Sequence, residues 1–239
     1  MNAVELPSPI ERPRLSDAIY SKLLQEIMAG KFSAGDRLPP ENQLALRFSV
    51  SRPVVREALQ RLQSDGVVIS RQGSGSYVQR SPSQRVGELT SEHSLHEVLQ
   101  VMELRMALEA LAARLAAQHR TDEHVRMIED ARQVLGETFA RKGEAKEADY
   151  AFHRAIATAS GNSVLVETLD QLSGRVMGGM NVTLSLTREA SKERRARVLD
   201  EHDRIVHAIK VGDADSAGIA MRYHLDQARN RLLDRHLDR

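Results

Sequence analysis

The sequence contains no proline after Pro82, so the C-terminal part of the chain is free to form long helices. Proline interrupts a helix because it lacks a backbone N–H and clashes with the preceding turn. The proline-free part repeats apolar residues at helical spacing in six long segments. They cover residues 94–118, 121–141, 144–159, 163–184, 190–211 and 213–236. We therefore predict an all-α antiparallel bundle of six helices, or of seven if the first segment splits.

The N-terminal part has a different pattern, in which three shorter helical segments precede two β-prone runs. Ser51 is suited to cap the third helix, and Pro53 fits its first turn, where no N–H is needed. The helices are expected at residues 15–29, 41–48 and 52–64, and the strands at residues 67–70 and 76–79. This is the order of a winged helix-turn-helix. The predicted fold class is therefore mostly α, with this unit before the bundle.

These patterns divide the chain into four regions. Residues 1–13 are expected to form a flexible arm, and residues 14–79 to form the winged helix-turn-helix. Residues 80–93 are polar and contain proline, glycine and serine, so we interpret them as a linker. Residues 94–239 form the helical domain.

Several classes of protein are excluded by composition. The chain has no cysteine, which excludes disulfides, thiolate zinc sites and a cysteine nucleophile, and fits a reducing compartment. It has no run of about 18 apolar residues and no apolar signal core at its N-terminus. We therefore expect a cytoplasmic protein with no membrane partner.

Charge is distributed unevenly between the two parts. Residues 1–80 contain 11 basic and 8 acidic side chains, whereas the remainder contains 23 basic and 25 acidic ones. The excess of positive charge favours a polyanion as the partner of the N-terminal part.

Two arginines mark the third predicted helix as a candidate for DNA recognition. Arg52 and Arg56 are four residues apart and therefore share one helix face. Arginine is well suited to bidentate contact with guanine in the major groove. Gln72 and Gly73 lie at the predicted wing tip, where a glycine lets the backbone approach a minor groove. The alternative is a solvated helix face, but the complete order of helices and wing favours DNA binding.

A family resemblance covers nearly all of residues 14–79 and rests on short motifs. They are Gly35-Asp36-Arg37-Leu38-Pro39-Pro40-Glu41, Leu44-Ala45, Ser51-Arg52-Pro53-Val54-Val55-Arg56-Glu57-Ala58-Leu59, Leu62, Gly66 and Gly73-Ser74-Gly75-Ser76-Tyr77-Val78. This stretch resembles the winged helix of the GntR superfamily. The DNA-binding set that follows from the motif and its resemblance is Arg37, Asn42, Ser51, Arg52, Pro53, Arg56, Gln72 and Gly73. Asn42 departs from the family, which commonly has an arginine there, so the operator sequence is expected to differ.

Three histidines and one aspartate in the helical domain are candidate metal ligands. Asp149 and His153 are four residues apart on one predicted helix, and His202 and His224 lie on two later helices. Three imidazoles and a carboxylate suit Zn²⁺ or a similar divalent ion. The alternative is a set of histidines that are hydrogen-bonded in the core or at its rim.

A second resemblance covers most of residues 94–236. It rests on Glu103-Leu104-Arg105-Met106-Ala107-Leu108-Glu109, Ala112-Ala113-Arg114-Leu115-Ala116-Ala117, Asp149-x-x-Phe152-His153, Gly161-Asn162-Ser163-Val164-Leu165, Glu201-His202-x-x-Ile205 and Met221-x-x-His224-Leu225. These motifs resemble the FCD effector domain of the FadR-like branch. The resemblance implies that residues 94–239 bind a ligand and dimerise, and that Asp149, His153, His202 and His224 hold a metal. Zinc is expected, with nickel or manganese as alternatives.

The same resemblance implies that Arg105 helps to hold an organic-acid effector. From the residues alone, a salt bridge with Glu109 on the helix surface is an equal alternative for Arg105. Arg175 and Asn181 are further candidates for the lining of the effector cavity.

Together these features predict a homodimeric regulator of transcription that binds a two-fold symmetric DNA operator. The expected type is a repressor that is released by a small organic or sugar acid. One alternative is a metal-dependent hydrolase, but the sequence contains neither His-Glu-x-x-His nor Glu-x-x-His. The others are a regulator whose metal is only structural and a helical adaptor that binds another protein.

Overall fold

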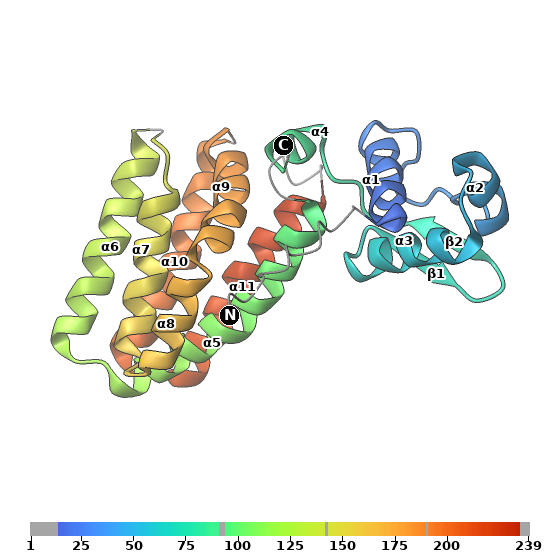
Figure 1. Cartoon of the computed structure of the whole chain (residues 1–239). Coiled ribbons are helices and arrows are strands. Elements are labelled where there is room, and N and C mark those ends of the chain that lie inside the picture. The colour runs from blue at the N-terminus through green and yellow to red at the C-terminus, as the bar shows by residue number, and fades with distance from the viewer. Residues whose placement is uncertain (1–13, 91–93, 142, 190, 235–239) are drawn as a thin grey trace, which may run out of the picture. The chain divides into compact units, whose positions relative to one another are not determined.

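The computed structural model describes residues 14–90, 94–141, 143–189 and 191–234. The chain divides into two compact units, residues 1–80 and residues 81–239. The first contains a small sheet, and the second is helical throughout its described part (Figure 1). The flexible arm that we predict for residues 1–13 lies outside the described residues.

The N-terminal unit has the predicted order of elements. Its helices are α1 (Leu15–Met28), α2 (Glu41–Phe48) and α3 (Arg52–Ser64), and its strands are β1 (Val68–Arg71) and β2 (Gly75–Val78). The strands pair antiparallel, with Val68 opposite Val78, and an isolated bridge joins Arg37 to Tyr77. The winged helix-turn-helix is thus confirmed, although each strand begins one residue away from its predicted start.

The core of this unit comes from apolar positions at helical spacing. Leu23 and Ile27 of α1 and Val55 and Leu62 of α3 are fully buried. One polar pair joins this core, because the Tyr20 hydroxyl donates a hydrogen bond of 2.6 Å to Asp65. Burial and the neighbouring carboxylate raise the pKa of Tyr20, so its hydroxyl keeps its proton.

Removing this hydroxyl is expected to weaken the winged helix. Tyr20→Phe takes a donor from a buried carboxylate and should cost about 1–3 kcal/mol. Hydrogen exchange of the α1 and α3 amides in the full-length protein measures this loss. Tyr223→Phe is the matched control because that ring is 50% exposed and lies in the other unit. Unchanged protection of α1 and α3 in Tyr20→Phe would contradict the assignment.

The second unit begins with a helix that the sequence did not lead us to expect. Helix α4 (Gln84–Leu89) occupies the middle of the predicted linker. Ser83 caps it by accepting a hydrogen bond from the Val86 amide, and Val86 itself is completely buried. The predicted linker, residues 80–93, therefore contains a short helix, which one buried valine and one cap suffice to fix.

Seven helices follow α4 in the described part of the chain. They are α5 (Leu95–His119), α6 (Asp122–Ala140), α7 (Lys146–Ala159), α8 (Ser163–Gln171), α9 (Ser173–Glu189), α10 (Lys192–Val211) and α11 (Ala214–Leu233). The first predicted segment stays whole as α5. The break falls instead in the segment 163–184, close to Ser173 and Gly174, which have low helix propensity.

The bundle is organised around α5, which packs along much of α11 and also contacts α7, α9 and α10 (Figure 1). Its core includes Met102, Phe152, Ile156, Ile205 and Met221, all of them completely buried. These residues come from α5, α7, α10 and α11, so the same four helices converge at the centre. In the part of the chain that the structure describes, no helix has the length and apolar character needed to cross a bilayer.

Candidate DNA-binding surface and metal-ligand cluster

All eight residues that we predict to contact DNA are exposed. Arg52 and Arg56 lie in the first two turns of α3, with 63% and 53% of their side chains exposed. Ser49 ends α2 in a left-handed conformation, at φ 54°, and so turns the chain from α2 into α3. Asn42 is exposed in the first turn of α2.

Glu41 connects the two arginines, a contact that the sequence did not indicate. Arg56 donates to both Glu41 carboxylate oxygens, through Nε at 3.0 Å and Nη2 at 2.8 Å. Nη2 of Arg52 lies 3.8 Å from Oε2 of the same group. The hydrogen bonds from Arg56 lower the pKa of Glu41. Exposed pairs of this kind are weak, so Glu41 orients the arginines while leaving them available to a stronger anion.

The wing tip is open, as a groove-reading element requires. Gln72 and Gly73 lie in the turn between β1 and β2. Gly73 has φ +70°, and apart from its chain neighbours no described residue has an atom within 4 Å of the position that a Cβ would take. Gly75 also has a positive φ of +112°, and the Arg37 guanidinium lies 3.1 Å from its Cβ position. Arg37 therefore lies against the wing.

Asp149, His153, His202 and His224 meet in the centre of the bundle. One potential ligand atom from each lies within 4.8 Å of the others, and all four residues are buried. We call them the metal-ligand cluster. Helix α7 supplies Asp149 and His153 from successive turns, while α10 and α11 supply His202 and His224.

Each histidine of this cluster has an acceptor beside its Nδ1. His202 Nδ1 is 2.7 Å from the Val198 carbonyl oxygen, and His224 Nδ1 is 2.8 Å from Glu201 Oε2. His153 Nδ1 lies against a carboxylate oxygen of Glu109. Such acceptors fix the Nδ1–H tautomer of metal-binding histidines and leave Nε2 as the ligand atom.

The inner atoms of the cluster fit a divalent cation. Nε2 of His202 and of His153 lie 3.2 and 3.8 Å from the Asp149 carboxylate oxygens. Nε2 of His153 is buried and has no hydrogen-bond partner among the described residues. A buried nitrogen lone pair without a donor is costly, and a metal ion would satisfy it. The donor set of three nitrogens and one oxygen is one that zinc commonly takes.

Burial and neighbouring groups shift the pKa values of two of these residues. Burial lowers the pKa of His224 well below its usual value, and the other two histidines add to this effect. Burial alone would raise the pKa of Asp149, but the hydrogen bond with His202 and the nearby imidazoles lower it instead. A neutral imidazole and an ionised carboxylate are the forms that bind metal.

Arg105 lies in the interior of the bundle. Its predicted salt bridge with Glu109 does form, but it is buried and does not lie on the helix surface. Arg105 and Glu109 are only 3% and 2% exposed, and Nε donates to Oε1 at 2.6 Å. Burial opposes ionisation of Glu109, but Arg105 and His153, through their charges and hydrogen bonds, together outweigh it and lower the pKa of this carboxyl. Nη2 of Arg105 is buried and has no partner in the described structure.

A small cavity lies beside the cluster. Arg105, Asp149, His224 and Arg231 contribute to its lining, together with Thr183 and Thr187 of α9. The guanidinium-bearing residues Arg105 and Arg231 thus line the same cavity as two potential metal ligands, Asp149 and His224. We call it the cluster cavity.

Arg175 and Asn181 do not line the cluster cavity. Arg175 is 68% exposed on its side chain, lies 3.9 Å from Glu97 and lines an apolar pocket next to Arg105. Asn181 is exposed near Lys146. The inward face of α9 carries Thr183 and Thr187, and a residue two positions before Thr183 points to the other side of a helix.

Three residues at this site were not assigned to it from sequence. Glu109 and Glu201 orient His153 and His224, and Arg231 pairs with Glu201 at 3.2 Å. Of these three, only Glu109 could have been found from the sequence, because it lies four residues after Arg105. Glu201 adjoins His202 but contacts a histidine of another helix, which no local pattern reveals.

Comparison with known proteins agrees with this architecture. The family model "Bacterial regulatory proteins, gntR family" matches residues 15–78, and the FCD domain matches residues 100–227. The HTH-type transcriptional regulator LutR of Bacillus subtilis is 34% identical over 202 residues, 83% of this chain and 92% of LutR. The HTH-type transcriptional repressor NanR of Escherichia coli is 30% identical over 228 residues, 91% of this chain and 84% of NanR. A solved GntR structure from Streptococcus agalactiae covers 90% of this chain and 99% of its own, at 24% identity and a TM-score of 0.47.

The family matches cover both units, and the relatives are regulators of transcription, so the regulator interpretation is confirmed and the hydrolase alternative is wrong. Regulation of transcription therefore explains three features together: the exposed arginine pair on α3, the open wing and the helical effector domain. The chain belongs to the GntR family, and it is a DNA-binding transcription regulator with an FCD domain.

Proposed function

We propose that the protein is a repressor that a small organic or sugar acid releases from its operator. The observation that carries this proposal is the cluster cavity, which Arg105 lines together with Asp149 and His224. Nη2 of Arg105 is buried and has no hydrogen-bond partner among the described residues. A buried guanidinium without a full set of acceptors is a site for a carboxylate. NanR, a relative over most of the chain, is by name a transcriptional repressor.

Asp149, His153, His202 and His224 would hold the metal, with zinc as the first choice and nickel or manganese as alternatives. The bound ion would supply a positive charge to which a carboxylate oxygen can bind. Arg105 would bind the other oxygen, and Arg231, on the same cavity, would add a second positive charge. Arg175 and Asn181 have no part in this proposal because they do not line the cavity.

The N-terminal unit would bind operator DNA in the cytoplasm. Arg52 and Arg56 would read base edges in the major groove, and Gly73 would approach the minor groove. Arg37, Asn42, Ser51, Pro53 and Gln72 would complete the contact surface. We assign residues 14–79 to DNA binding and residues 94–239 to effector binding and dimerisation, so the operator should have two-fold symmetry.

Arg52→Ala should weaken operator binding by about 1–3 kcal/mol and relax the preference at one base pair. The measurement is fluorescence anisotropy of a labelled fragment of the promoter beside the gene, at fixed salt, with substituted fragments. Arg126→Ala is the control, because it removes an exposed positive charge from α6 of the helical domain. If Arg52→Ala retained both affinity and base preference, the assignment of Arg52 would fail.

A further inference from the structure

The cluster cavity is too small, as it stands, to admit an organic acid. Its volume is about 10 Å³, which is room for about one water molecule. Asp149 and His224, which line it, are each only 4% exposed. A metal ion or an acid can therefore enter this cavity only when side chains in its wall move.

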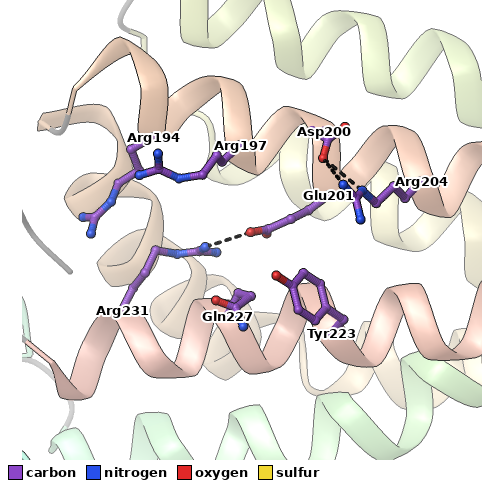
Figure 2. Close-up of a pocket in the computed structure, with 8 residues that line it drawn as sticks. All are labelled: Arg194, Arg197, Asp200, Glu201, Arg204, Tyr223, Gln227 and Arg231. Atoms are coloured by element: carbon purple, nitrogen blue, oxygen red, sulfur yellow. Dashed lines mark hydrogen bonds and ion pairs between the residues drawn. The ribbon is translucent and has the colours of Figure 1, made fainter.

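A much larger pocket adjoins the cluster cavity, in the groove between α10 and α11 (Figure 2). We call it the outer pocket, and its volume is about 280 Å³. Every side chain that lines it is polar or charged, namely Arg194, Arg197, Asp200, Glu201 and Arg204 of α10 and Tyr223, Gln227 and Arg231 of α11. Arg231 also lines the cluster cavity, so the two spaces adjoin at this residue.

The pair of Arg231 and Glu201 forms the wall between the two spaces. Nη1 of Arg231 donates a hydrogen bond of 3.2 Å to Glu201 Oε1, shown as a dashed line in Figure 2. The other oxygen of Glu201 lies 2.8 Å from Nδ1 of His224, which lines the cluster cavity. The pair thus reaches from the outer pocket to a potential metal ligand.

Arg231 is the less firmly held of the two arginines on the cluster cavity. It lies in the last turn of α11, and the ends of helices fray. Arg105 lies in the middle of α5 and donates to Glu109 over a shorter distance, 2.6 Å. Arg231 is therefore the side chain that can move aside at the lower cost.

Two smaller pockets also adjoin the cluster cavity, each with a volume of about 10 Å³. One of them, the apolar pocket, shares Arg105 with the cavity and is otherwise lined mainly by aliphatic side chains of α5, α8 and α9. The other shares the aliphatic side chain of Leu184. Moving a charged species past apolar groups costs much free energy, so the polar outer pocket is the easier path.

We propose that the metal ion and the acid enter the cluster cavity between α10 and α11, with the Arg231–Glu201 pair as the gate. This inference rests on the proposed function, because it concerns access to the same cavity. The gate opens when Arg231 leaves Glu201, which keeps His224 Nδ1 as its other partner. Nε of Arg231 is buried and has no hydrogen-bond partner within the described ranges, so it is a further donor for an entering carboxylate.

Single cysteines can test this route because the chain has no cysteine of its own. Gln227 lies one turn before Arg231 on the same face of α11, so Gln227→Cys puts a thiol beside the gate (Figure 2). Leu104→Cys is the matched control, because Leu104 is 43% exposed and lines the apolar pocket beside Arg105. Each full-length variant is loaded with zinc and then labelled with a methylthio or a benzylthio group, which differ only in bulk.

Release of zinc to an excess of a chromogenic chelator, followed by absorbance, measures how readily the route opens. On Gln227→Cys, the benzylthio group should slow release by at least about tenfold relative to the methylthio group, because it obstructs the gate. On Leu104→Cys, the same exchange of labels should leave the rate within about twofold. Removal of the benzylthio label by a reductant should restore the rate, which shows that the fold has survived.

Removal of the gate should have the opposite effect. Arg231→Ala should speed both the uptake and the release of zinc by at least about tenfold, because a gate limits passage in both directions. Arg222→Ala is the control, since it removes an exposed positive charge from the same helix.

The gate is overturned if the benzylthio group on Gln227→Cys leaves release unchanged, or if the group on Leu104→Cys slows release as much. A wild type that binds no zinc at all would overturn the metal site of the proposed function together with the gate. Failure of the gate alone therefore differs from failure of the proposed function, because only in the first case does the wild type bind zinc.

Discussion

Alanine in place of His202 is expected to abolish stoichiometric metal binding by the helical domain. His202 is the most buried member of the metal-ligand cluster, at 0% exposure, and its Nε2 lies 3.2 Å from Asp149. Loss of an outer partner of a ligand already costs about 10- to 100-fold in metal affinity, so loss of a ligand should cost more. Metal analysis by mass spectrometry after dialysis measures the stoichiometry directly.

A matched control is available on the same helix. His207 is exposed on α10, so His207→Ala removes an imidazole without touching the cluster. The wild type and His207→Ala should lose thermal stability when a chelator removes the metal, because a bound ion stabilises the folded state by mass action. His202→Ala should show no such shift, while its winged helix keeps its native hydrogen-exchange protection. Equal metal content in the two variants would refute the site.

Glu109→Ala is expected to destabilise the helical domain by about 3–5 kcal/mol, because it leaves a buried charge without its partner. The charge is that of Arg105, which is 3% exposed and donates to Glu109. His153 loses its acceptor in the same variant. Urea unfolding followed by circular dichroism measures the loss. Glu103→Ala is the control because Glu103 is exposed on the same helix.

A double variant separates the buried charge from the shape of the site. Replacing both partners, as Arg105→Leu/Glu109→Leu, should recover much of the lost stability, since apolar pairs often substitute for buried ion pairs without net cost. The same variant should lose its response to a carboxylate effector. If Glu109→Ala were as stable as Glu103→Ala, Arg105 would have another anion beside it, and our account of the cavity would be wrong.

Sequence reasoning succeeded where local pattern decides structure. Helical periodicity and the glycine-rich wing are properties of neighbouring residues, so they predicted the winged helix-turn-helix. Ser51 occupies the predicted N-cap position of α3, but its side chain makes no cap hydrogen bond there. The strand ends and the break near Ser173 were less accurate, because tertiary packing decides where a helix or strand ends.

The candidate site was only partly predictable. The resemblance to the FCD domain named Asp149 and the three histidines, and the structure brings these four together. Spacing alone showed that Arg105 and Glu109 are neighbours, but not that both are buried. Contacts between distant elements, such as Glu41 with Arg56 and Glu201 with Arg231, leave no periodic signal. Asn181 is a polar residue that was predicted to line the effector cavity. Its side chain is instead exposed on the opposite face of α9.

Anisotropy of the labelled promoter fragment, bound by the metal-loaded protein, tests the central claim most directly. The titrations use a panel of small carboxylates that includes hydroxy acids, dicarboxylates and sugar acids. We predict that the fragment binds specifically and that at least one acid weakens binding by about 5- to 150-fold, the usual range of allosteric coupling. This response should be absent in Arg105→Leu/Glu109→Leu and in metal-free protein. Operator affinity that is the same with every acid, with and without metal, would contradict the account.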